Sequence, residues 1–171
     1  MKIGVLSDTH DNIPVTIALL KDMIRNNPDI IIHLGDIISP FTARAIRDVI
    51  GTTGLIAVKG NNDGDVEQLV NIFSGYGWSF HTSPTVIEVG GRRMLLFHGF
   101  DGIDFTEKTA EAYARSMSVD AVLFGHTHRP YVKRVNGVLV ANPGEACGYL
   151  TNKSTYLILD TDEMSVELFQ V

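Results

Sequence analysis

Aspartate, asparagine and histidine residues recur in this sequence directly after short apolar segments, and these side chains are ones that bind divalent cations. The seven candidates are Asp8, His10, Asp36, Asn61, His98, His126 and His128. Carboxylate and imidazole groups without a thiolate suit Mn²⁺, Fe²⁺, Ni²⁺ or Zn²⁺. Seven ligands are too many for one tetrahedral ion, but they suit two ions with open coordination positions. We therefore expect a centre for two divalent metal ions.

The spacing of the candidates gives this expectation a geometric basis. Asp8 and His10 are two residues apart, and His126 and His128 repeat that spacing. In an extended segment, side chains two residues apart point the same way. A glycine lets the backbone turn sharply and approach a site closely. One stands directly before each of three candidates: Gly35, Gly60 and Gly125.

The segments that carry the first candidates alternate between strand and helix patterns. Buried strands are expected at residues 3–7, 29–34 and 55–59. Apolar residues at helical spacing follow each strand, at 13–24, 41–49 and 66–73. The Ser39-Pro40 pair is a helix start signal. A βαβαβα series predicts a parallel sheet flanked by helices, with ligands bound beyond the carboxyl ends of its strands.

The second half of the chain has a different pattern. Two hairpins are expected, at 85–97 around Gly90-Gly91 and at 131–141 around Asn136-Gly137. A helix along 110–117 and a buried strand at 121–124 lie between them, and strands at 154–159 and 164–169 close the chain. With 171 residues and no linker or repeat, residues 1–171 are expected to form a single α/β domain with a mixed sheet or two packed sheets.

Composition narrows the range of partners. The formal net charge is −6, with no basic block, so there is no strong signal for nucleic-acid binding. No apolar stretch approaches membrane-spanning length, and Cys147 is the only cysteine. We expect a cytoplasmic protein without a membrane segment, and a homo-oligomer is compatible with the sequence. Cys147 itself is expected to be inert.

Five motifs, in order, resemble those of the calcineurin-like metallophosphoesterase superfamily, and in particular its small single-domain bacterial and archaeal phosphodiesterases. They are Asp8-Thr9-His10, Gly35-Asp36, Gly60-Asn61-Asn62-Asp63, His98-Gly99 and Gly125-His126-Thr127-His128. The resemblance runs from about residue 3 to residue 144. It implies a four-layer α/β/β/α sandwich of two packed mixed sheets with flanking helices, and a dimetal site between the strand ends.

The resemblance also implies roles for the candidates. One ion would bind Asp8, His10, Asp36 and His128, and the other would bind Asp36, Asn61, His98 and His126. A hydroxide bridging the ions would attack the phosphorus, which makes Asp36, Asn61 and His98 catalytic. Two divalent ions bring four positive charges, the two aspartates remove two and the hydroxide one, which leaves one to attract an anionic phosphate. Mn²⁺ is the first choice of metal, with Ni²⁺, Fe²⁺ and Zn²⁺ as alternatives.

Three positions depart from the family pattern. Asn62 stands where many relatives have a histidine that protonates the leaving group, and Phe100 and Glu145 replace a histidine and a serine. Asn62 cannot transfer a proton, so the substrate expected is a small phosphodiester, with Asn62 and Arg129 as candidate substrate contacts. A phosphomonoesterase and a non-catalytic scaffold of the retromer-subunit type are the alternatives.

Two further polar residues have structural explanations. His33 lies within the expected strand at 29–34, and we interpret it as a core histidine whose polar atoms are hydrogen-bonded. Asp63 precedes the expected helix at 66–73 and is interpreted as its cap rather than as a substrate contact.

Overall fold

The first sheet combines strands from the N-terminal half with the C-terminal hairpin. In the computed structural model, which describes residues 1–171, the strand order is β11-β10-β1-β2-β3-β4. The strands are β1 (Lys2–Leu6), β2 (Ile30–His33), β3 (Gly54–Val58), β4 (Ser79–His81), β10 (Thr155–Asp160) and β11 (Ser165–Gln170). Strands β1 to β4 run parallel to one another, whereas β10 and β11 are antiparallel to their neighbours. The first sheet is therefore mixed.

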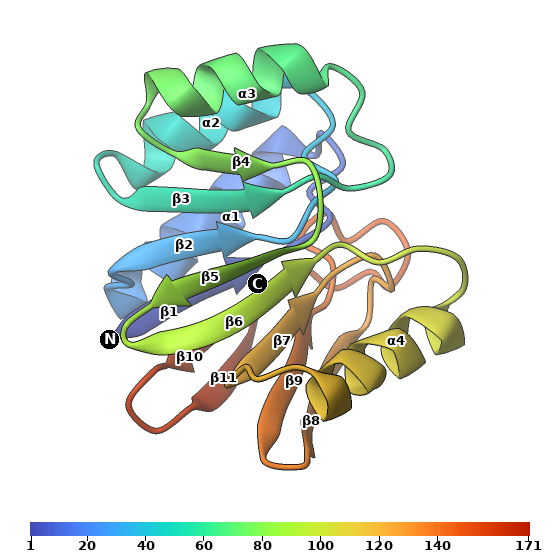
Figure 1. The fold of residues 1–171 in the computed structure, drawn as a ribbon. Coiled ribbons are helices and arrows are strands. Elements are labelled where there is room, and N and C mark those ends of the chain that lie inside the picture. The colour runs from blue at the N-terminus through green and yellow to red at the C-terminus, as the bar shows by residue number, and fades with distance from the viewer.

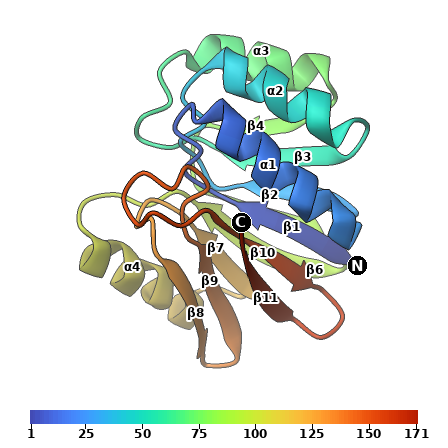
Figure 2. The ribbon, with the colours of Figure 1, turned by 180° about the vertical axis from the view of Figure 1, so that it is seen from behind.

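Three helices cover the outer face of this sheet (Figures 1 and 2). They are α1 (Ile13–Met23), which continues into the 3₁₀ turn η1 (Ile24–Asn26), α2 (Pro40–Ile50) and α3 (Val66–Gly75). A proline occupies the first turn of α1 and of α2, where its missing N–H costs no helical hydrogen bond. Their apolar faces pack on the sheet in a cluster of 17 buried residues that includes Leu20, Ile46 and Phe73.

The second sheet has the order β5-β6-β7-β9-β8. Its strands are β5 (Thr85–Val89), β6 (Arg92–Phe97), β7 (Ala121–Phe124), β8 (Pro130–Val135) and β9 (Val138–Pro143). Strands β6, β7 and β9 are mutually parallel, and β5 and β8 are antiparallel edges. Helix α4 (Ile103–Ser116) packs on the outer face through a cluster that includes Phe97 and Ala110.

The inner faces of the two sheets pack on each other. Fourteen buried residues form this central layer, among them Val5 and Ile32 from the first sheet and Leu96 and Leu123 from the second. The layers are thus helices, sheet, sheet and helix, as Figure 1 shows. The expected α/β/β/α sandwich is confirmed. No helix has the length and apolar character that a membrane crossing requires.

Two elements differ from the expected ones. Strand β4 was not expected from the sequence. It has only three residues, too few to show an alternation of apolar and polar side chains, and it pairs in parallel with β3. Helix α4 begins at Ile103, well before the first residue of the expected helix. The apolar pattern indicated a later start because Ala110 is the first apolar residue of this helix that is buried. Phe105, in the first turns of α4, is half exposed.

Candidate metal centre

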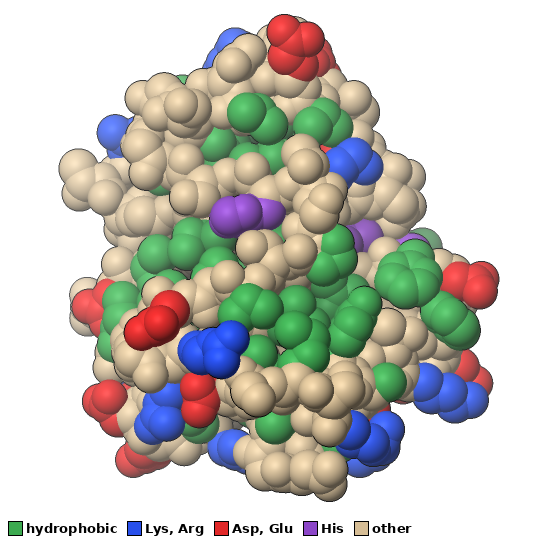
Figure 3. Space-filling model, viewed as in Figure 1, with side chains coloured by type: hydrophobic (Ala, Val, Ile, Leu, Met, Phe, Trp, Pro, Cys, Tyr) green, Lys and Arg blue, Asp and Glu red, His purple; other side chains and the backbone are tan.

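All seven candidate residues follow the carboxyl ends of parallel strands, and these ends meet where the two sheets adjoin. Asp8 and His10 follow β1, Asp36 follows β2 and Asn61 follows β3, while His98 follows β6 and His126 and His128 follow β7. Histidine side chains reach the surface along the boundary between the two halves of the molecule (Figure 3). The structure therefore brings together side chains from both sheets.

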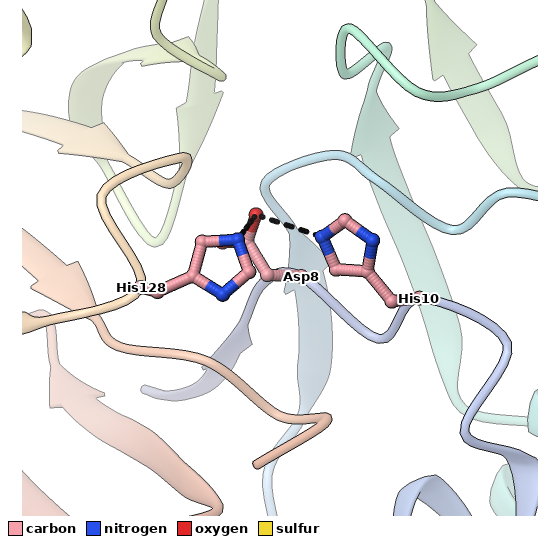
Figure 4. Close-up of side chains that lie close together, drawn as sticks. All are labelled: Asp8, His10 and His128. Carbon is pink, nitrogen blue, oxygen red and sulfur yellow. Dashed lines mark ion pairs between the residues drawn. The ribbon is translucent and has the colours of Figure 1, made fainter. Parts of the chain in front are cut away.

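The first cluster surrounds the carboxylate of Asp8. Its Oδ1 atom lies 3.8 Å from Nε2 of His10 and 3.5 Å from Nε2 of His128, and the two rings flank it (Figure 4). Asp8 Oδ1 and His10 Nε2 are buried and have no hydrogen-bond partner. Buried polar atoms are nearly always paired, so two orphaned atoms facing each other mark a place for a cation. The three side chains fit a metal ion.

The second cluster joins Asn61, His98 and His126. The Oδ1 atom of Asn61 lies 3.0 Å from Nε2 of His98 and 2.9 Å from Nδ1 of His126. The other ring nitrogens contact carbonyl oxygens, of Leu34 at 2.7 Å and of Asp101 at 2.8 Å. A carbonyl only accepts, so these outer nitrogens carry hydrogen, and in the neutral form of each ring the inner nitrogen presents a lone pair. Three lone-pair atoms then converge, which is a cation-binding arrangement.

The carboxylate of Asp36 lies between the two clusters. Its Oδ2 atom is 3.3 Å from Nε2 of His10 and 3.4 Å from Nε2 of His98. The potential ligand atoms of Asp8, Asp36 and His98 also lie within 4.8 Å of one another. Asp36 is therefore placed where one carboxylate can contact ions on both sides.

Two buried carboxylates make the centre a region of negative potential. Burial raises the pKa of Asp36, but the His98 ring and the Asn62 amide more than offset this and hold that pKa well below its usual range. The pKa of Asp8 is lowered in the same way, by His10 and the other rings against burial. In turn, Asp8 raises the pKa of His10. Burial lowers the pKa of His98, but the carboxylates of Asp36 and Asp8 more than offset this, so the pKa of His98 also rises. The site favours positive charge.

The local backbone around the candidates is not extended. Five of them have positive φ angles: Asp8 (57°), His10 (43°), Asp36 (59°), His126 (69°) and His128 (58°). The expectation of an extended segment is wrong, because the N–H groups of Thr9 and His10 both bond the carbonyl of Asp36 and wrap the loop around the end of β2. His126 and His128 consequently point into different clusters. Left-handed non-glycine residues cost energy and concentrate at functional sites.

The three glycines before the candidates do allow a close approach. A Cβ on Gly60 would lie 2.1 Å from Oδ1 of Asp36, and one on Gly35 would lie 2.5 Å from Nδ1 of His98. A Cβ on Gly125 would lie 2.0 Å from Oγ of Ser7. Any side chain at these positions would displace the site, so the need for glycine is steric.

The two candidate substrate contacts occupy different surroundings. The side-chain amide of Asn62 donates to Oδ2 of Asp36 at 2.8 Å, and its backbone N–H donates to Oδ1 at 2.8 Å. Asn62 is exposed at the mouth of the site while it holds the central carboxylate. Arg129 is exposed next to His128. Their contacts with a substrate remain predictions.

Asp63 does not cap helix α3, so the interpretation made from the sequence is wrong. The cap is Asp65, which accepts from the N–H of Gln68 at 3.2 Å. The buried carboxylate of Asp63 instead accepts from the N–H groups of Asp36, Ile38 and Gly60, at 3.2, 2.7 and 2.7 Å. Asp63 thus fastens together the loops after β2 and β3, and with them the central carboxylate.

Replacing Asp63 by alanine is expected to lower the free energy of unfolding by about 3 kcal/mol, because up to three buried donors lose their acceptor at about 1–3 kcal/mol each. Denaturant unfolding measures the change. Asp65→Ala is the matched control and should cost only about 1 kcal/mol, the usual loss for a helix cap. Equal losses in the two variants would contradict the fastening role.

His33 is a core histidine, as expected from the sequence. Its side chain is fully buried, and burial lowers its pKa to about 3, so the ring is neutral. Its Nδ1 accepts from the N–H of Gly35 at 3.2 Å, so Nε2 carries the hydrogen and donates to Oγ1 of Thr9 at 3.2 Å. Thr9 donates onward to the carbonyl of Asp36. His33 thus braces the loops beneath the site.

Glu145 lies near the site, and no role for it was predicted from the sequence. It follows the carboxyl end of β9, and its buried carboxylate accepts from Nδ1 of His128 at 2.7 Å. Burial raises its pKa, but hydrogen bonds from His128, Thr151 and Leu150 more than offset this and lower the pKa to about 2, so the carboxylate is charged. The only signal in the sequence was the departure from the family's serine.

A four-layer sandwich with carboxylates and imidazoles gathered at the strand ends of both sheets defines a metal-dependent phosphoesterase. The calcineurin-like phosphoesterase superfamily domain matches residues 1–164, and the chain belongs to this superfamily. The family implies divalent metal ions, and the donor sets described above fit them.

Individual relatives agree with this assignment. Phosphodiesterase MJ0936 of Methanocaldococcus jannaschii is 33% identical over 164 residues, which cover 95% of each chain. The solved structure of an archaeal phosphodiesterase is similar over the full length of both chains, with a TM-score of 0.89 and 31% identity. The zinc complex of Vps29 from Entamoeba histolytica shares the fold, with a TM-score of 0.68 and 21% identity over 100% of this chain and 98% of that one.

Proposed function

We propose that this protein hydrolyses small phosphodiesters with two divalent cations bound at the centre between the sheets, and that residues 1–171 form its single catalytic domain. The observation that carries the proposal is the convergence of Asn61 Oδ1 with the inner ring nitrogens of His98 and His126, next to a second cluster on the other side of the Asp36 carboxylate. Imidazole nitrogens, an amide oxygen and carboxylates that converge in this way form a donor set suited to divalent cations.

In this proposal each of the two clusters would hold one ion. Asp8, His10 and His128 would hold one ion, Asn61, His98 and His126 the other, and Asp36 both. When bound, two such ions would activate a water molecule for attack and would offset the negative charge that develops on the phosphate. Asn61 is exposed and His10, His126 and His128 are half-buried, whereas His98 is buried, so both clusters can be reached from the surface.

The substrate preference follows from charge and from the position of Asn62. A monoester near neutral pH carries nearly two negative charges and a diester carries one, which the excess charge of the loaded site offsets. The amide of Asn62 cannot donate a proton to a leaving group, and its N–H faces Asp36. Hydrolysis of a diester depends less than hydrolysis of a monoester on a group that donates a proton to the leaving group, so diesters are the favoured substrates.

The metal and the compartment are part of the same proposal. A donor set of carboxylates, imidazoles and one amide suits Mn²⁺ first, with Ni²⁺, Fe²⁺ and Zn²⁺ as alternatives. The single thiol, Cys147, is buried, and burial raises its pKa to about 12, so it forms neither a disulfide nor a thiolate ligand. A chain without disulfides suits the reducing cytoplasm.

A protein-binding scaffold is the second candidate function, and similarity to the fold of Vps29 supports it. A scaffold has no need for the full set of seven residues, whereas this chain has all seven in two facing clusters. The set therefore favours hydrolysis. Metal analysis together with turnover of bis(p-nitrophenyl) phosphate tests the choice. Two ions per chain with turnover are expected, and two ions without turnover of any phosphate ester would favour the scaffold.

Replacing Asn62 by histidine is expected to raise the kcat/KM for aryl monoesters relative to matched aryl diesters by about tenfold or more, because general acid catalysis contributes about 10²–10⁴-fold where it operates. Kinetics with p-nitrophenyl phosphate and bis(p-nitrophenyl) phosphate give the ratio. Asn62→Ala is the control, since it removes the contact with Asp36 without adding an acid. A wild-type preference for the monoester would refute the diester assignment and leave the metal centre unaffected.

A further inference from the structure

The carboxylate of Glu145 is fully buried at the edge of the metal centre, where an unpaired charge would be costly. Glu145 follows the end of β9 and His128 follows the end of β7, and these two strands are parallel neighbours. The two residues therefore reach the same end of the second sheet from neighbouring strands. Glu145 is not a member of either cluster, because it contacts Nδ1 of His128, the ring nitrogen that points away from Asp8.

Five donors satisfy this carboxylate. Its Oε2 atom accepts from Nδ1 of His128 at 2.7 Å and from Sγ of Cys147 at 3.2 Å. Its Oε1 atom accepts from the N–H of Thr151 at 2.5 Å and from the Thr151 hydroxyl at 2.7 Å. The N–H of Leu150 is shared between the two oxygens, at 3.0 and 3.1 Å. So many bonds keep the carboxylate charged and fix its position.

An ionised carboxylate only accepts hydrogen bonds, so Nδ1 of His128 must carry a hydrogen. In the neutral ring Nε2 is then the atom with the lone pair, and it faces Oδ1 of Asp8 at 3.5 Å. The same contact fixes the rotation of the ring about its side chain. A carboxylate behind a metal-binding histidine orients the ring and makes it a stronger ligand.

We propose that Glu145 is a positioning residue that holds His128 in the tautomer and orientation needed to bind the ion shared with Asp8 and His10. The proposal rests on the proposed function, since it requires His128 to bind a metal. Glu145 does not itself bind the ion, because all of its bonding capacity is used by the five donors. It contributes to one ion site and not to the other, because its only contact with the two clusters is His128.

The test is the affinity of each of the two ions, measured by competition with a fluorescent chelator, in the wild type, Glu145→Gln, His128→Ala and the double variant. Glu145→Gln keeps the size of the side chain but removes its charge. It should weaken one ion by about 10–100-fold, the usual cost of losing such a partner, and leave the other unchanged. In the His128→Ala background it should have no further effect. Glu167→Gln, exposed on β11, is the matched control and should change neither ion.

Several outcomes would overturn the inference. Unchanged affinities in Glu145→Gln, equal weakening of both ions, or losses that add to those of His128→Ala would each show that Glu145 does not act through His128. Nitrogen-15 NMR of the Zn²⁺-loaded wild type gives a second test that requires no variant. Hydrogen on Nδ1 of His128 is expected, and hydrogen on Nε2 would overturn the proposal. Wild type that binds fewer than two ions would instead count against the proposed function.

Discussion

Exhaustive chelation is expected to abolish phosphodiester hydrolysis by this protein, and Mn²⁺ is expected to restore it. The centre consists of imidazole rings, carboxylates and an amide that contact one another, and none of these groups is a hydroxyl or thiol nucleophile with its own base. Without cations, nothing activates water or offsets the charge on the phosphate. The measurement is turnover of an aryl diester before chelation, after it, and during titration with Mn²⁺.

The form of the recovery tests the number of ions. If both are required, activity should return only as the second equivalent binds, and a plateau after one equivalent would contradict the two-ion proposal. Circular dichroism of the chelated protein is the control. The three hydrophobic clusters lie between the layers rather than at the centre, so the fold should persist. Activity that survives complete removal of metal would refute metal-dependent hydrolysis.

Local sequence patterns predicted most of the strands and helices because those elements bury one continuous apolar surface. The run Val5–Leu6 and the helix face with Leu20 are read directly from the order of residues. The assignment of strands to sheets was harder. Strand β10 pairs with β1 across almost the whole chain, and only the packed structure specifies such a contact. The resemblance, rather than periodicity, supplied the two-sheet architecture.

The chemical identity of the site was predictable, but its local geometry was not. Carboxylates and imidazoles after strand ends are visible in the sequence, whereas the left-handed backbone at Asp8 and Asp36 follows from hydrogen bonds between loops. Asp63 and Asp65 are alike in the sequence, and only their partners separate a fastening residue from a helix cap. The partners of Glu145 likewise lie in a loop that no pattern predicted.

The same contacts explain why the centre tolerates little change. Asp36 is held by Asn62 on one side, its backbone N–H is fixed by Asp63, and its carbonyl accepts from Thr9. Gly60 lies so close that any Cβ there would meet the carboxylate. The position of Asp36 is thus determined from four directions, and a substitution there tests its charge rather than its placement.

Asp36→Asn is expected to lower kcat/KM for diesters by about 10³-fold or more. Electrostatic stabilisation by bound metal is worth several kcal/mol, and each 1.36 kcal/mol is tenfold in rate. The amide has nearly the size of the carboxylate but no charge, so both ions lose the group proposed to join them. Metal analysis and steady-state kinetics on the same preparation measure the effect. Asp48→Asn, on the exposed side of α2, is the matched control and should behave like wild type.

Comparison with His128→Ala separates a bridging carboxylate from an ordinary ligand. His128 contacts only the first cluster, so its loss should empty or weaken one site and spare the other. Asp36 lies 3.3 Å from His10 and 3.4 Å from His98, in different clusters, so its loss should weaken both ions together. If Asp36→Asn keeps two tightly bound ions and near-normal turnover, Asp36 does not bridge, and the two clusters must hold their ions independently.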